Sequence, residues 1–204
     1  MFELGVVYRN ILRTDAAIAD GLAKQGYLAL CPDLFWRQEP GIQITDKTEA
    51  EWQRAFQLFN GFDVDKGVDD LKATLDTLRK TPGCSGKVGT VGYCLGGKLA
   101  FLMATRSSAD CNVSYYGVGL DGLVGEASKI TKPTMLHIAE LDKFVPPESQ
   151  KKVKDGLAGN AHVTIHSYPG VDHAFAREGG QHWNAQAAGL ANQRSADFFR
   201  KHLG

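Results

Sequence analysis

Residues 87–105 read KVGTVGYCLGGKLAFLMAT, and this stretch decides the fold. Its first part contains Val88, Val91 and Tyr93, a β-prone run, whereas the part from Leu99 onward consists of good helix formers. The stretch therefore predicts a strand, a sharp turn and a helix, with Cys94 at the turn.

The turn has the sequence pattern of a nucleophile elbow with cysteine in the place of serine. Gly92, Gly96 and Gly97 bracket Cys94 as G-Y-C-L-G-G, the Gly-x-nucleophile-x-Gly pattern. Glycine is needed because so tight a turn strains the nucleophile and brings backbone close enough for Cβ atoms to clash. The helix N-terminus behind it offers N–H donors and a positive dipole end, which favours a thiolate. The alternatives are a buried structural cysteine and a phosphate-binding turn.

The length and the charge of the chain indicate a single globular domain without a polyanionic partner. The 204 residues predict one domain, residues 1–204, with room for a sizeable core. Lys+Arg and Asp+Glu are both 23, so no net field favours nucleic acid or an acidic membrane surface as a partner. No apolar stretch is long enough to cross a bilayer, and the first residues lack the pattern of a secretory signal. We expect a cytoplasmic protein.

The four cysteines are widely spaced, at Cys31, Cys84, Cys94 and Cys111. No CxxC pair indicates zinc or a redox dithiol, so we expect free thiols and no metal. Cys31 and Cys111 adjoin apolar runs and are predicted strand fillers, and Cys84 is predicted in a turn. Only Cys94 has the context of a site.

The rest of the chain alternates helical and strand patterns. Besides the elbow, helices are expected over 15–25, 46–60, 64–79, 146–157 and 181–202, and strands over 2–8, 27–31, 111–116, 133–140 and 161–168. This alternation predicts an α/β fold, a mostly parallel sheet with helices on both faces.

Two features of the helix over 46–60 carry separate expectations. Thr45 or Asp46 is the expected N-cap. Trp52, Phe56 and Phe59 form one stripe, for which core packing is the favoured interpretation.

Three residue types needed for acyl transfer each follow a predicted strand. Cys94, Asp142 and His173 therefore meet at the edge where parallel strands end. The chain order nucleophile, acid, histidine is that of α/β-hydrolases. His173 would take the thiol proton, and Asp142 would fix the imidazole tautomer. The alternatives are an exposed turn carboxylate for Asp142 and a capping or surface histidine for His173. The other histidines are expected to be structural or on the surface: His137, His162, His166, His182 and His202.

From about Asp20 to Leu203 the sequence closely resembles the dienelactone hydrolase family (carboxymethylenebutenolidases) of the α/β-hydrolase superfamily. The resemblance is carried by CPDLFWRQEPG at 31–41, GKVGTVGYCLGG at 86–97, YYGVG at 115–119, LDKFVPP at 141–147 and DHAFAR at 172–177. It implies Cys94 as nucleophile with Asp142 and His173 as partners, and hydrolysis of an enol-lactone to a dicarboxylic acid without metal or cofactor.

The resemblance also implies substrate-binding residues. Arg177 would reach the substrate carboxylate, with a surface ion pair as the alternative, and Tyr115 would line the pocket near the cysteine. The family's usual arginine and tyrosine on the helix after the PDLF loop are replaced here by Trp52 and Phe56. Arg54 lies two residues further on, roughly 200° around the helix, and is not expected to substitute. A larger, more apolar or singly charged ester is therefore expected.

The amino end departs from the family pattern, because the first strands are expected to be shortened or missing. The Leu95 N–H is the expected first oxyanion donor and the second is unassigned. Glu3 is a weak candidate for the glutamate that holds the resting cysteine, and the ungapped alignment places Val7 in that slot.

The expected function is hydrolysis of a small carboxylic ester or lactone through a thioester on Cys94, by a monomer or weak homodimer. The alternative is a catalytically impaired small-molecule binding protein or a redox-responsive thiol protein on the same fold.

Overall fold

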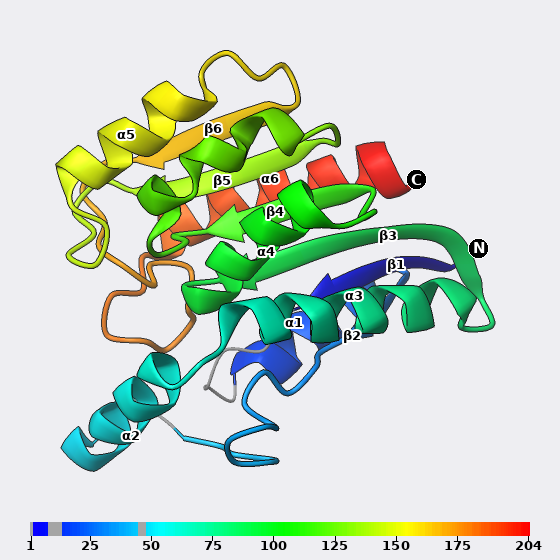
Figure 1. Cartoon of the computed structure of the whole chain (residues 1–204), viewed down its shortest axis with the longest axis horizontal. Helices are drawn as coiled ribbons and strands as arrows, with labels where there is room; N and C mark the ends of the chain where they lie inside the picture. The colour runs from blue at the N-terminus through cyan, green and yellow to red at the C-terminus, as the bar shows by residue number, and fades with distance from the viewer. Residues whose placement is uncertain (1, 8–13, 45–47) are drawn as a thin grey trace.

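The computed structural model describes residues 2–7, 14–44 and 48–204. Six strands form one sheet in the order β2-β1-β3-β4-β5-β6, and every neighbouring pair is parallel (Figure 1). The strands are β1 (Phe2–Val7), β2 (Tyr27–Leu30), β3 (Cys84–Tyr93), β4 (Cys111–Tyr115), β5 (Thr134–Ala139) and β6 (Val163–Tyr168).

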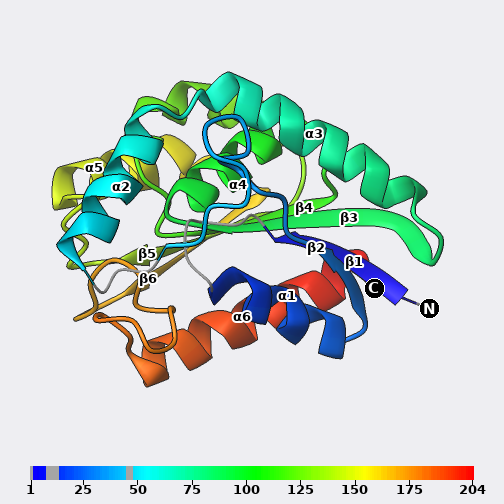
Figure 2. The same ribbon diagram turned by 90° about the horizontal axis from the view of Figure 1, so that it is seen from below.

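Helices cover both faces of this sheet. They are α1 (Thr14–Lys24), α2 (Glu49–Asn60), α3 (Val64–Lys80), α4 (Leu95–Arg106), α5 (Pro147–Leu157) and α6 (Ala185–Leu203), with short 3-10 helices η1 (Leu120–Gly122) and η2 (Val124–Lys129). Helices α1 and α6 lie on one face, and α3, α4 and α5 lie on the other (Figure 2). The predicted α/β architecture is therefore confirmed.

The strand order reverses next to β1. This strand pairs with β2 on one side and with β3 on the other, so both of its partners come later in the chain. Val7, the last residue of β1, pairs with Val91, three residues before Cys94. Ligands of open parallel sheets bind at the carboxyl ends of the strands beside such a reversal, and the elbow lies at that position.

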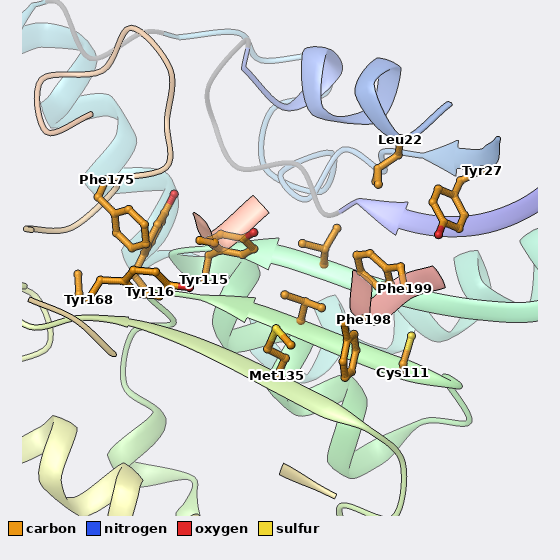
Figure 3. Packing of buried hydrophobic residues seen from close by; sticks show 14 of the residues in the cluster. Leu22, Tyr27, Cys111, Tyr115, Tyr116, Met135, Tyr168, Phe175, Phe198 and Phe199 are labelled. Carbon is orange, nitrogen blue, oxygen red and sulfur yellow. The ribbon is translucent and has the colours of Figure 1, made fainter. Parts of the chain in front are cut away.

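Helix α4 is buried from Leu95 to Thr105 except at Lys98, in keeping with its apolar run from Leu99 to Ala104. It packs against β3, β4 and α3, and the inner face of α3 carries Val68, Leu71, Leu75 and Leu78, each at most 1% exposed. These four positions confirm the periodicity of the predicted helix. On the opposite face an aromatic cluster that includes Tyr115, Tyr116, Phe198 and Phe199 fills the space between the sheet and α6 (Figure 3).

The expectations for α2 are wrong in two respects. The helix begins at Glu49 with Thr48 as its N-cap, and a capping box joins Thr48 to Glu51. The expected N-cap residues 45 and 46 lie outside the described residues. Phe56 and Phe59 are 46% and 37% exposed and only Leu58 is buried, so the aromatic stripe is not core. Figure 1 shows α2 projecting from the rest of the molecule.

Cys84 also departs from its expected place, since it begins β3 rather than lying in the preceding turn. Cys111 begins β4 and is fully buried, as expected of a strand filler. Burial raises the pKa of the Cys111 thiol far above its ordinary value.

A chain of hydrogen-bonded side chains runs between the sheet and α6. In order it links Arg194, Tyr168, His137, Ser195, Tyr115 and Asn192, at 3.1, 2.8, 2.9, 2.7 and 3.1 Å. Arg194 can only donate and the Asn192 Oδ1 atom can only accept. Every bond of the chain is therefore satisfied when each group donates to the next one in the direction from Arg194 to Asn192. His137 is then neutral, with its proton on Nε2.

Acid is expected to destabilise the protein through His137. Burial, with the positive charges of His166 and Arg194, lowers the pKa of His137 from 6.5 to about 3. The unfolded chain therefore binds a proton in this window that the folded chain does not, and stability falls as the pH drops below 6.5. Between pH 7 and pH 5 this effect amounts to about 2 kcal/mol.

The effect is measured as the pH dependence of the free energy of unfolding, from urea titrations of the wild type and of His137→Gln. We expect the wild type to lose more stability than His137→Gln between pH 7 and 5. The exposed His162 provides the control, since His162→Gln should follow the wild-type curve. Parallel curves for wild type and His137→Gln would contradict the assignment of a neutral His137.

Candidate active site

The elbow forms as the sequence predicts, between β3 and α4. Cys94 is half-buried and has φ 56° and ψ −113°, a conformation that L-residues adopt only under constraint. Its N–H donates to the carbonyl of Tyr115 at 3.0 Å. A Cβ atom at Gly92 would lie 2.0 Å from the Gly96 carbonyl oxygen, and one at Gly97 would lie 2.6 Å from the Tyr115 carbonyl oxygen. The turn therefore requires glycine at both positions.

Replacing Gly92 with alanine is expected to prevent formation of the elbow. The new Cβ atom would overlap backbone rather than a flexible side chain, so neither β3 nor α4 can move aside cheaply. We expect a loss of at least about 4 kcal/mol in the free energy of unfolding. Gly21, inside α1, gives the control, because a Cβ atom added there would have nothing within 4 Å. Gly21→Ala should be neutral or stabilising, and equal stability of the two variants would contradict the steric requirement.

The N-terminus of α4 lies directly after Cys94. The helix begins at Leu95, and Lys98 N–H donates to the Cys94 carbonyl at 3.1 Å as the first turn closes. The N–H groups of Leu95 and Gly96 precede that bond and have no partner within the helix. N–H groups at a helix N-terminus can bind an anion, and the role of Leu95 as an oxyanion donor stays a prediction.

His173 and Asp142 come together from the loops that follow β6 and β5. The Nδ1 atom of His173 lies 2.8 Å from Oδ2 of Asp142, and both side chains are nearly buried. The other carboxylate oxygen, Oδ1, accepts from the backbone N–H groups of Phe144 at 2.8 Å and Val145 at 3.2 Å. Because both oxygens are occupied, Asp142 holds one orientation and fixes that of the imidazole. Neither residue is the exposed surface group of the alternative interpretation.

The protonation of His173 depends on three opposing influences. Burial lowers its pKa, and this is outweighed by the hydrogen bond to Asp142 and by the side chain of Cys94, which together raise it from 6.5 to about 10. The Nε2 atom is buried and makes no hydrogen bond of ordinary geometry with any other described residue. Because the Cys94 side chain is among the groups that raise the pKa of the ring, Cys94 and His173 are near enough to interact electrostatically.

Hydrogen bonds from the Gln150 side chain hold the loop that carries Asp142. The buried amide of Gln150 donates to the carbonyls of Ala139 at 3.0 Å and Val145 at 2.8 Å, on either side of Asp142. The ring of Phe144 packs edge-on against His173, with centroids 4.9 Å apart. Sequence reasoning missed both residues, since a glutamine in a helix and a phenylalanine in a loop carry no catalytic signal.

Backbone strain is concentrated at this site. Among the described residues, the non-glycine residues with positive φ are Cys94, Tyr116 and Ala174. Ala174 follows His173, and the ring of Tyr116 packs against the His173 ring with centroids 5.0 Å apart. Strained conformations persist where the surrounding structure imposes them, and they gather at functional sites.

Tyr115 does not line the pocket that the sequence resemblance implies. Its ring is 1% exposed, and its hydroxyl bonds to Ser195 and Asn192 of α6 within the core. The contribution of Tyr115 to the site is its backbone carbonyl, which accepts from the Cys94 N–H. Burial also raises the pKa of its phenol well above the ordinary value.

The remaining predicted substrate-binding residues are Arg177, Trp52 and Phe56. Arg177 is half-buried in the turn after His173, and its guanidinium lies against Gly180. Trp52 and Phe56 stack on each other on α2, with ring centroids 5.8 Å apart. Arg54 forms an ion pair with Glu39, as expected of a residue that does not replace the family's arginine.

Glu3 and Val7, the two amino-terminal candidates, lie at different distances from Cys94 along the sheet. Glu3 lies one residue before Leu4, which pairs with Val88, six residues before Cys94. At about 3.3 Å per residue, Glu3 lies on the order of 20 Å along the strands from Cys94, so its suggested role is wrong. Val7 lies at the correct end of β1. The residues that follow it, 8–13, are outside the described part of the chain.

The described residues contain no group of three or more His, Cys, Asp or Glu side chains arranged to hold a metal ion. None of their helices combines the length and apolar character needed to cross a bilayer.

Comparison with known proteins identifies the family. The sequence profile of the dienelactone hydrolase family matches residues 4–203. A protein of Azospirillum brasilense, provisionally named carboxymethylenebutenolidase, is 57% identical over 197 residues, covering 92% of this chain and 80% of its own. A carboxymethylenebutenolidase of Pseudomonas putida is 41% identical over 177 residues, covering 87% and 75%. A crystal structure of a provisionally named dienelactone hydrolase from Klebsiella pneumoniae superposes with a TM-score of 0.83 at 24% identity, covering 98% and 87%. The chain therefore belongs to the dienelactone hydrolase family and is a hydrolase with the α/β-hydrolase fold.

Proposed function

We propose that the protein hydrolyses small carboxylic esters or lactones, with Cys94 as nucleophile, His173 as proton carrier and Asp142 as the group that orients His173. The observation that carries this proposal is the imidazole itself. Its Nδ1 atom is held by Asp142 at 2.8 Å, its buried Nε2 atom has no hydrogen bond of ordinary geometry within the described part of the chain, and the Cys94 side chain raises the pKa of the ring. This is the arrangement of a nucleophile, a base and an orienting acid.

In the first step the thiolate of Cys94 attacks the carbonyl carbon of the substrate. A C–S bond forms, and the carbonyl π electrons move to the oxygen, whose negative charge is stabilised by the Leu95 N–H at the helix N-terminus. The oxyanion then collapses and the C–O bond to the leaving alkoxide breaks. His173 gives its Nε2 proton to that alkoxide, which leaves a thioester and a neutral imidazole.

In the second step water replaces the sulfur. Forming the thioester removes the negative charge of Cys94, one of the influences that raise the pKa of His173. The imidazole is then free to take a proton from water, and the resulting hydroxide attacks the thioester carbon. The C–S bond breaks with its electron pair on sulfur, which restores the thiolate beside a protonated His173 and releases the carboxylic acid.

The substrate class is proposed from the family and from α2. The curated relatives are named carboxymethylenebutenolidases, which suggests a lactone. Trp52 and Phe56 occupy the helix positions where the family usually has an arginine and a tyrosine, and they present stacked aromatic rings. An ester that is more apolar than a dienelactone, or that carries a single charge, is therefore favoured.

A hydrolysis panel tests the proposal. It compares cis- and trans-dienelactone with aryl and alkyl esters of increasing chain length, each read as kcat/KM. We expect hydrolysis of several members, with aryl or longer alkyl esters preferred over the dienelactones. If an ester or lactone of the panel stabilised the folded protein and none was hydrolysed, the protein would be a binding protein and the proposal would be contradicted.

A further inference from the structure

The two loops that carry Asp142 and His173 are joined along their length. Glu140 N–H donates to the carbonyl of Tyr168 at 3.1 Å, and Leu141 N–H donates to the carbonyl of Val171 at 3.0 Å. These bonds extend the parallel pairing of β5 and β6 toward the site. They end just before the two side chains that must meet, and one further group joins the last residues of the two loops.

That group is the carboxylate of Asp172. Its Oδ1 atom accepts from the N–H of His173 at 2.7 Å and from the N–H of Lys143 at 3.2 Å. Lys143 directly follows Asp142 in the chain, and His173 directly follows Asp172. One oxygen atom therefore ties the backbone beside Asp142 to the backbone of His173.

The second oxygen of Asp172 faces the rim of the site. Oδ2 lies 3.3 Å from the Lys143 Nζ atom and 3.9 Å from His182 Nδ1. The Lys143 side chain is 79% exposed and that of His182 is 40% exposed, so water and salt screen both pairs. The bonds to Oδ1, in contrast, come from two backbone N–H groups, one from each loop. We therefore expect the acceptor oxygen to matter more than the charge.

We propose that Asp172 is a positioning residue, whose Oδ1 atom sets the separation of Asp142 and His173 by holding the N–H groups of Lys143 and His173 together. This inference rests on the proposed function, in which those two side chains orient and carry the proton. Asp172 takes no part in proton transfer, because its carboxylate contacts backbone and rim groups rather than an imidazole nitrogen of His173.

The role as a hydrogen-bond acceptor separates two substitutions at this position. Asp172→Asn keeps an oxygen that can accept from both N–H groups, and it loses the charge. Asp172→Ala loses the acceptor and leaves both N–H groups to water. A misplacement of reacting groups by about 1 Å costs on the order of 10²-fold in rate. We therefore expect kcat to fall about 10- to 100-fold in Asp172→Ala and to stay within about threefold of wild type in Asp172→Asn.

The experiment measures kcat and KM for p-nitrophenyl acetate in both variants, with Lys143→Ala and His182→Ala as controls. The controls remove the partners of Oδ2 and keep the backbone N–H of Lys143, so they should retain wild-type kcat. A positioning role predicts that Asp172→Ala changes kcat and leaves KM close to that of the wild type.

A second measurement does not depend on catalysis. The Nδ1 proton of His173, hydrogen-bonded to Asp142, should give a low-field proton resonance that is absent from His173→Gln. We expect Asp172→Asn to retain this resonance and Asp172→Ala to lose or shift it while its far-ultraviolet circular dichroism stays that of the wild type.

The outcomes separate this inference from the proposed function. Unchanged kcat and an unchanged resonance in Asp172→Ala would overturn the positioning role. A loss of kcat in Asp172→Asn equal to that in Asp172→Ala would also overturn it, because charge rather than the acceptor would then matter. If the wild type hydrolyses no ester but the resonance is lost only in Asp172→Ala, the positioning role stands and the proposed function fails.

Discussion

Replacing Cys94 with alanine is expected to abolish turnover of p-nitrophenyl acetate. The substitution removes the only atom that can form the acyl-enzyme in the proposed mechanism, while the elbow backbone and the α4 N-terminus remain. The rate should fall at least about 10³-fold, because the oxyanion donor and the binding site alone give little acceleration of water attack. The measurement is kcat/KM by release of p-nitrophenolate, corrected for the uncatalysed reaction.

The control for this variant is Cys84→Ala. Cys84 begins β3, at the end of the strand opposite to Cys94, so it lies far from the carboxyl edge of the sheet. Its substitution should leave kcat/KM within about twofold of wild type, as expected for a change away from the reacting atoms. Turnover by Cys94→Ala at the wild-type rate would exclude Cys94 as the nucleophile.

The second large effect is expected from Asp142→Asn. The asparagine keeps an oxygen to accept from Phe144 and Val145, so the loop should retain its shape. Its amide N–H₂ group then faces Nδ1 of His173, and the imidazole must place its proton on Nε2 to accept from it. A histidine with that tautomer cannot take the proton of Cys94, and the expected loss in kcat is about 10⁴-fold.

The matched control changes an aspartate in the helix that follows the Asp142 loop. Asp155 lies at the surface of α5 and pairs with Lys151 four residues earlier. Asp155→Asn should retain wild-type kcat, since such exposed pairs contribute little. A loss of less than about tenfold in Asp142→Asn would show that His173 does not need an acceptor at Nδ1.

The elbow was predictable because its signals are local. The spacing of Gly92, Gly96 and Gly97 follows from steric contacts within one turn, and those contacts are present around Cys94. Asp142 and His173 required one more step, that parallel strands end at a common edge. The sheet topology supplies that edge without detailed knowledge of packing.

The side of the sheet on which a residue lies was not predictable. Strand β4 is buried on both faces, so its sequence gives no alternation that would separate them. The placement of Tyr115 in the pocket failed for this reason, since its ring points to the face that α6 covers. The predicted start of α2 was wrong because residues 45–48 read TDKT and offer several possible N-cap residues in succession.

The role proposed for Asp172 could not be predicted from the sequence either. An aspartate before a histidine in a turn is ordinary, and its meaning depends on Lys143, which lies 29 residues away in the chain. Only the pairing of the β5 and β6 loops brings the two together.

The exposure of Phe56 and Phe59 on α2 was missed because an aromatic stripe at helical spacing is usually part of the core.

The central claim, that Cys94 becomes acylated during hydrolysis, is tested most directly by mass spectrometry of the intact protein. The enzyme is mixed with p-nitrophenyl acetate, quenched in acid during turnover, weighed and then digested to locate any modification. We predict a mass increase of one acetyl group, located on the peptide that contains Cys94 and absent from Cys94→Ala. Turnover accompanied by an acetyl group on another residue, or by no covalent species on Cys94 at any time, would contradict the claim.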